Sequence, residues 1–178
     1  MDEAPIRRTP AGDVVDGPGW FVLNVGDARW QRHEALGTWY MPQAATAPFP
    51  HYGIGIHVLQ PRQSNGRYHA ETAQEDFLVL AGECLAIVEG RERPMRAWDH
   101  LHCPPGTRHI MVGAGDSPCA ILMAGGRFEG KTTFYPVDEV AARHGASVSA
   151  DATTGREAYA DLDYDAFADA PSAFPFTT

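Results

Sequence analysis

The chain has 178 residues, of which 44% are hydrophobic, and a formal net charge of −9. This length and composition fit one globular domain with a sizeable core. The acidic balance argues against a nucleic-acid partner, because phosphate binding needs clustered basic residues. The nearest basic cluster, Arg91-Glu92-Arg93, is interrupted by an acid and reads as a solvated turn.

Nothing in the sequence predicts export or membrane insertion. Residues 1–19 are rich in Pro, Gly and Asp and lack the apolar stretch of a signal peptide. The densest apolar run, residues 119–124, has the length of a strand. The three cysteines, Cys84, Cys103 and Cys119, fit reduced thiols better than a disulfide framework. We therefore expect a cytoplasmic protein with no membrane partner.

Short β-strands dominate the first two thirds of the chain. Residues 1–18 are predicted to form a loose arm. Strands then follow at regular spacing between Gly and Pro turns, a pattern typical of a sandwich or jelly roll. The predicted strands are 20–24, 37–41, 52–59, 75–81, 83–88, 94–102, 110–112 and 120–124.

The C-terminal part changes character. Residues 136–145 are predicted to form a short helix, with Pro136 in its first turn and Gly145 at its end. Residues 156–170 are expected to hold another helical turn or two. The tail is rich in aromatic residues, which are costly to leave in water: Tyr159, Tyr164, Phe167, Phe174 and Phe176. We expect three segments, namely an arm (1–18), a barrel (19–135) and a C-terminal helix and tail (136–178) that packs on the barrel or on a second subunit, and we expect a homodimer.

Two short stretches carry the chemistry. His69 and Glu71 are two apart and share a face if they lie on a strand, and a turn over 72–74 could fold the run from Glu75 back beside them. His109 follows the turn pair Pro105-Gly106. Two imidazoles and two carboxylates suit a divalent metal of intermediate hardness. The sequence therefore predicts a metal inside a small β-barrel, with one side open to substrate.

These stretches resemble the two signature motifs of the cupin superfamily. The first family motif is G-x5-H-x-H-x3/4-E-x6-G, and the chain has His69-x-Glu71-x3-Glu75-x6-Gly82. The second is G-x5-P-x-G-x2-H-x3-N, matched here by Trp98-x5-Pro104-x-Gly106-x2-His109-x3-Gly113. Fifteen residues separate the two motifs, which is the length of the family's intermotif hairpin. The resemblance covers about residues 50–126 and is specific because the two motifs occur as a pair.

The chain also departs from the family pattern. Glu71 stands at the place of the second His, which moves the predicted ligand set toward oxygen. Gln63 and Trp98 replace the opening glycines, and Gly113 replaces the closing Asn. The resemblance implies an all-β fold, a double-stranded β-helix (jelly-roll) cupin barrel with a short C-terminal helix and an extended tail.

The resemblance further implies His69, Glu75 and His109 as metal ligands, with Glu71 as a candidate fourth. Without Glu71 the set is two His and one carboxylate, which is the set of non-haem Fe(II) oxygenases. We expect one divalent ion per chain, Fe, Mn or Zn, with Ni able to enter during purification. The alternative is a barrel that lost its metal and binds its ligand by hydrogen bonds alone.

Three functions follow from these observations. The first is a metal-dependent enzyme that acts on a small polar metabolite and is of the dioxygenase, isomerase or lyase type. The second is a protein that binds or stores a small molecule with the help of the metal. The third is an interaction scaffold. Arg67, Arg108, His100 and His102 are the nearest polar candidates outside the ligand set, with a surface role favoured for Arg108. No catalytic residue is assigned by the sequence.

Overall fold

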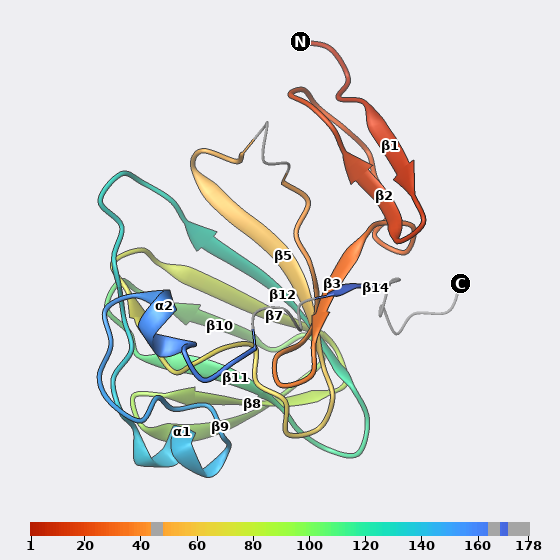
Figure 1. The fold of residues 1–178 in the computed structure, drawn as a ribbon. Helices are drawn as coiled ribbons and strands as arrows, with labels where there is room; N and C mark the ends of the chain where they lie inside the picture. The colour runs from red at the N-terminus through yellow and green to blue at the C-terminus, as the bar shows by residue number, and fades with distance from the viewer. Residues whose placement is uncertain (44–47, 164–167, 171–178) are drawn as a thin grey trace.

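Antiparallel β-strands form nearly all of the regular structure (Figure 1). The computed structural model describes residues 1–43, 48–163 and 168–170. Among these described residues, two helices are present, α1 (Glu139–Arg143) and α2 (Gly155–Ala158), which are five and four residues long. The all-β prediction is therefore confirmed.

The larger of the sheets has seven strands. In spatial order they are β10 (His100–Cys103), β7 (Glu75–Ala81), β12 (Cys119–Gly126), β5 (Tyr52–Leu59), β4 (Gly37–Tyr40), β3 (Trp30–His33) and β14 (Ala168–Ala170). All of the pairings are antiparallel, and β12 lies between β5 and β7, with Met123 opposite both Gly55 and Phe77. Strands that are far apart in the chain thus meet in the centre of this sheet.

A second layer faces this sheet. It contains β11 (His109–Gly113), β8 (Glu83–Val88) and β9 (Arg91–Arg96), in that order. A further short antiparallel pair joins β6 (Ala70–Glu71) to β13 (Thr133–Phe134). The β8 and β9 strands form the expected intermotif hairpin, and the two layers fit a double-stranded β-helix.

The main core fills the space between the two layers. Phe77 and Val79 come from the large sheet, while Ala86 and Met111 come from the small one, and all four side chains are at most 2% exposed. The three cysteines lie in the same cluster as free, buried thiols. Successive side chains of β7 point to opposite faces of the sheet, so Glu75 lies on the same face as the buried Phe77 and Val79.

The C-terminal segment covers the outer face of the small sheet. Ala141 of α1 and Ala146 pack in one cluster with Tyr68 and Ile110. Asp138 caps α1 by accepting a hydrogen bond from the Ala141 amide. The helix predicted over 136–145 is thus present but shorter. The boundaries predicted for the three segments remain predictions.

Some local predictions differ from the structure. The arm predicted over residues 1–18 holds a hairpin, β1 (Ile6–Thr9) and β2 (Gly12–Val15), and residues 20–24 form only an isolated bridge at Trp20. The strand predicted over 94–102 is interrupted between β9 and β10. In the predicted helical region 156–170, the described residues contain helix only in α2, and residues 168–170 form the edge strand β14. The tail aromatics Tyr164, Phe167, Phe174 and Phe176 lie outside the described residues.

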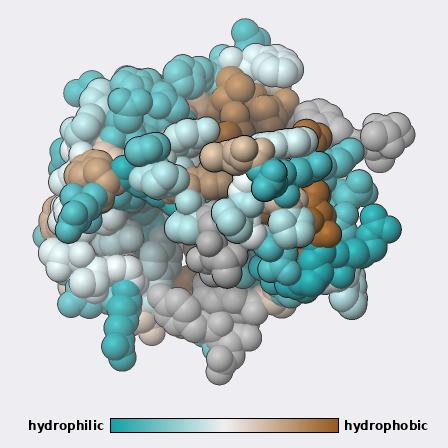
Figure 2. Space-filling view, turned by 90° about the horizontal axis from the view of Figure 1, so that it is seen from above, coloured by the Kyte–Doolittle hydropathy of each residue, from teal (hydrophilic) through white to brown (hydrophobic). Residues whose placement is uncertain are grey.

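The surface is mostly hydrophilic, with an apolar zone visible when the molecule is viewed from above (Figure 2). The described side chains that stay exposed include Trp20, Val22, Met41 and Tyr52. No helix among the described residues is long and apolar enough to span a membrane.

Candidate metal centre

The two motif histidines lie directly opposite each other across a backbone bridge. The amide of His69 donates to the carbonyl of His109 at 3.1 Å, and the amide of His109 donates to the carbonyl of His69 at 2.8 Å. Residues paired in this way project their side chains to the same side of the sheet. The ring centroids are accordingly 4.8 Å apart.

Glu75, the first residue of β7, completes a group of three donors. Its Oε2 lies 3.5 Å from Nε2 of His69 and 3.3 Å from Nε2 of His109. One ligand atom from each of the three residues lies within 4.8 Å of the others. Phe77 contacts the ring of His109 edge-on, with centroids 5.1 Å apart. The sequence-predicted residues His69, Glu75 and His109 are thus brought together, and we call them the triad.

The outer nitrogens of both rings are held by backbone carbonyls. Nδ1 of His69 lies 2.7 Å from the carbonyl oxygen of Arg67, and Nδ1 of His109 lies 3.0 Å from that of Thr107. A carbonyl can only accept, so each Nδ1 carries a proton and donates it. In the neutral ring the lone pair is then on Nε2, which faces Glu75.

The triad fits a metal ion. Nε2 of His109 and Oε2 of Glu75 are buried, and neither atom has a hydrogen bond of good geometry. Buried polar atoms without a partner are costly. Two imidazole nitrogens and one carboxylate oxygen are a donor set that suits Zn, Fe or Mn, and the outer-nitrogen hydrogen bonds are those of typical metal-binding histidines.

Without a metal, the triad shares protons. Burial opposes the charged form of Glu75, yet the two imidazoles lower the pKa of its carboxyl to about 2. Burial likewise disfavours charge on His109, but its neighbours Cys103 and Glu75 raise the pKa of its imidazole to about 9. For His69, burial is again outweighed, chiefly by Glu75, and the pKa is raised. These pKa shifts favour an imidazolium at His109 beside the ionised carboxylate of Glu75.

Glu71 is placed differently from the triad. Its Oε2 forms an ion pair with Nζ of Lys131, and its Oε1 accepts a hydrogen bond from Oγ1 of Thr133 at 3.3 Å. Glu71 does not belong to the group of three converging donors. The role of Glu71 as a fourth ligand remains a prediction. The charge of its carboxylate is already neutralised by the ammonium group of Lys131.

A cavity of about 230 Å³ opens beside the triad. His69 and Glu75 form one side of it, and Phe77 and Met123 contribute apolar surface. Two cationic residues, Arg127 and Lys131, also line it. Sequence reasoning missed both, since Lys131 lies outside the motif region. Lys131 is the only lysine of the chain, and this was a compositional signal of a special role. Composition alone, however, could not show where in the fold Lys131 lies.

The remaining polar candidates lie away from the cavity. Arg108 forms an ion pair with Glu89 on the surface, which agrees with the surface role favoured by the sequence. His100 and His102 are half exposed and both contact Oδ1 of Asp76, at 3.1 and 2.8 Å. None of these three side chains is among the residues that line the cavity.

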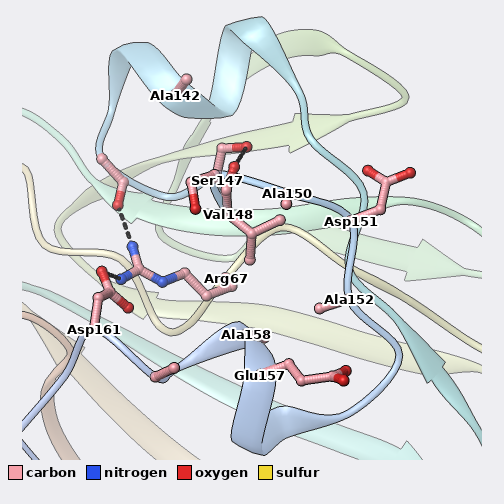
Figure 3. Close-up of a pocket in the computed structure, with 13 residues that line it drawn as sticks. Arg67, Ala142, Ser147, Val148, Ala150, Asp151, Ala152, Glu157, Ala158 and Asp161 are labelled. Carbon is pink, nitrogen blue, oxygen red and sulfur yellow. Dashed lines mark hydrogen bonds and ion pairs between the residues drawn. The ribbon is translucent and has the colours of Figure 1, made fainter.

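Arg67 connects the triad to the C-terminal segment (Figure 3). Its guanidinium donates to the carbonyl of Gly145 at 2.8 Å and to the carboxylate of Asp161 at 2.6 Å, and its amide donates to the hydroxyl of Tyr159. The close-up shows Arg67 between two stretches of this segment, beside a second cavity of about 630 Å³. Because the carbonyl of Arg67 accepts from Nδ1 of His69, the C-terminal segment supports His69 from behind.

The two facing β-layers and the donor triad fit the double-stranded β-helix that the paired motifs predicted. Residues 55–125 match the family model of the Cupin domain, a range that contains the whole triad. This part of the chain is therefore similar to the Cupin domain, the family that the paired motifs predicted.

Several solved structures are similar to the chain. A cupin-superfamily sugar phosphate isomerase from Silicibacter pomeroyi is 22% identical over 60% of this chain and 68% of its own, with a TM-score of 0.48. An RmlC-like cupin from Shewanella frigidimarina is 15% identical over 57% and 85%, with a TM-score of 0.48.

A provisionally named sugar phosphate isomerase from Acidithiobacillus ferrooxidans is 22% identical over 47% of this chain, with a TM-score of 0.45. The match spans only 55% of the length of that protein. The search of curated proteins found no match.

Proposed function

We propose that the protein is a metal-dependent cupin enzyme that holds one divalent ion on His69, Glu75 and His109 and acts on a small polar metabolite. The observation that carries the proposal is the orientation of the two imidazoles. Their outer nitrogens are tied to the carbonyls of Arg67 and Thr107, so that both Nε2 atoms face Glu75. An ion pair alone would not need both rings to be fixed in this way.

In this proposal, different residues of the chain have different roles. The triad holds the ion, Phe77 and Met123 keep one wall of the cavity apolar, and the open side admits substrate. The cavity is smaller than the roughly 300–1,000 Å³ usual for drug-sized ligands, which favours a small metabolite. When bound, a divalent ion polarises a carbonyl or lowers the pKa of a coordinated water.

Metal content tests the first half of the proposal. Untagged protein, loaded with Zn²⁺ and freed of excess ion, should contain close to one ion per chain by elemental analysis. His69→Ala and His109→Ala should each lose it, since two donors remain. His102→Ala is the matched control, because the ring of His102 is half exposed, contacts Asp76 and does not line the cavity, and it should keep the metal. Full metal in both triad variants would contradict the proposal.

Turnover tests the second half. Fe²⁺-loaded protein is supplied with phenolic, sugar and keto-acid compounds while oxygen consumption and product formation are followed. Oxygen uptake would identify an oxygenase, and product without oxygen uptake would identify an isomerase or lyase. Tight binding of a co-purifying metabolite that is returned unchanged would reject the enzyme in favour of a binding or storage protein.

A further inference from the structure

The cavity beside the triad has a cationic side that metal binding does not require. Arg127 and Lys131 both come from the loop between β12 and β13 and both line the cavity. Lys131 is paired with Glu71. Arg127 has no carboxylate partner among the residues that the structure describes; its Nη1 donates to the carbonyl of Phe49 at 3.2 Å. Most of its donor capacity is therefore available to a ligand.

Two facing glycines make room for this arrangement. Gly53 of β5 and Gly125 of β12 are direct cross-strand partners. A Cβ at Gly53 would lie 2.9 Å from Nη2 of Arg127, so the guanidinium rests against bare backbone. A Cβ at Gly125 would lie 3.4 Å from Oε1 of Glu75. The missing side chains thus leave an open floor between Arg127 and the triad.

The charges of the cavity favour an anion. Glu71 and Lys131 cancel each other, and Glu75 offsets only part of the charge of a divalent ion. Arg127 then adds a further positive charge to a partly enclosed site, where charges are screened less than in water. A neutral ligand would leave this excess uncompensated, whereas an anion would neutralise it.

We propose that the site binds a small organic anion, with an anionic group on the guanidinium of Arg127 and its other end at the triad. This inference rests on the proposed metal site and names the substrate class for it. Apolar contacts from Ile54, Phe77 and Met123 suit a short hydrocarbon body between the two ends. The planar guanidinium can hold a carboxylate through two parallel hydrogen bonds.

Succinate and its monoamide, succinamate, test the proposal as a matched pair. One carboxylate of each can reach the ion, and only succinate offers a second anion to Arg127. Calorimetric titration of Zn²⁺-loaded protein should show succinate binding about ten-fold more tightly than succinamate. In Arg127→Gln this difference should disappear, and Arg127→Lys should retain part of it. Gly53→Ala should resemble Arg127→Gln, because the new methyl group displaces the guanidinium.

The outcomes separate the two proposals. Arg93→Gln, an exposed change on β9, is the control and should behave as wild type. Metal content is measured on every sample, and an absence of metal from wild type would reject the metal site by itself. Equal affinity of wild type for the two probes, binding of neither, or a preference for succinate that survives in Arg127→Gln would overturn the anion site.

Discussion

The carbonyl oxygen of Arg67 lies 2.7 Å from Nδ1 of His69, while the guanidinium of the same Arg67 bridges Gly145 and Asp161. One residue thus links a metal-ligand candidate to a segment about eighty to ninety positions further along the chain. Tyr135 reinforces the link, since its ring centroid is 5.7 Å from that of His69. Arg67 and Tyr135 together hold His69 from behind.

Arg67→Lys should weaken metal binding although it keeps the charge. A lysine ammonium cannot bridge the two acceptors with the planar fork of arginine, so the backbone at residue 67 loses its anchor. Changes to groups that orient ligands typically cost about ten-fold or more in metal affinity. Competition with a chromogenic chelator measures the loss. Arg62→Lys, on a turn away from the triad, is the control, and equal affinities for the two variants would refute the role of Arg67.

Metal affinity should rise with pH. The pKa of His109 in the metal-free protein is raised to about 9 and that of His69 is also raised, so the ion must displace a proton at neutral pH. The metal affinity should rise about ten-fold per pH unit for each proton that the ion displaces. Chelator competition at pH 6.5, 7.5 and 8.5 gives the slope, and a flat profile would contradict the shared proton.

Glu75→Gln and Glu71→Gln form a matched pair. Glu75→Gln should lose the metal, because it removes the only carboxylate of the triad. Glu71→Gln should keep most of the affinity, since its carboxylate is already held by Lys131. Elemental analysis of the two variants decides the point, and comparable metal loss in both would restore Glu71 as a fourth ligand.

His57 should make the protein less stable in acid. It is buried at 7% exposure beside Trp39, and burial lowers its pKa from 6.5 to about 4. The unfolded chain therefore binds the proton more readily than the folded one between these values. The stability contributed by neutral His57 is fully present above pH 6.5. The free energy of unfolding then decreases by about 3 kcal/mol as the pH falls from 6.5 toward 4.

Chemical denaturation in the presence of a chelator between pH 4 and 7 measures this dependence. His57→Leu removes the titrating group at similar size and should flatten the curve in this window. The lowered pKa of Glu75 changes the free energy of unfolding only below pH 4.5, and the raised pKa of His109 changes it only above pH 6.5. Neither effect overlaps with the pH range in which His57 titrates. Parallel curves for wild type and His57→Leu would exclude the mechanism.

Trp98→Gly should stabilise the protein. Trp98 occupies the position of a motif glycine and has φ of 75°, a left-handed conformation that costs a non-glycine residue about 1–2 kcal/mol. Its side chain is 74% exposed, so little packing is lost on removal. We expect an increase of about 1 kcal/mol in the free energy of unfolding. Trp98→Ala, which keeps the strain, should not show the gain, and an equal effect of both changes would locate the cause elsewhere.

The sequence determined the strand core and the triad because both depend on local periodicity. Alternation along residues 75–81 fixes which side chains face inward, and the motif spacing fixes where each hairpin turns. The convergence of His69, Glu75 and His109 was therefore predictable from residues that belong to recognised motifs. The hairpin at residues 6–15 was not, since its Pro- and Gly-containing sequence has no clear alternation.

Only the tertiary structure decided which charges share the cavity. Lys131 neutralises Glu71, and Arg127 rests on Gly53, although more than fifty residues separate each pair. No periodicity encodes such contacts, because they arise when β12 pairs with β5 and carries its following loop to the site. Local spacing thus set the donors, and long-range strand pairing set the electrostatic surroundings in which they act.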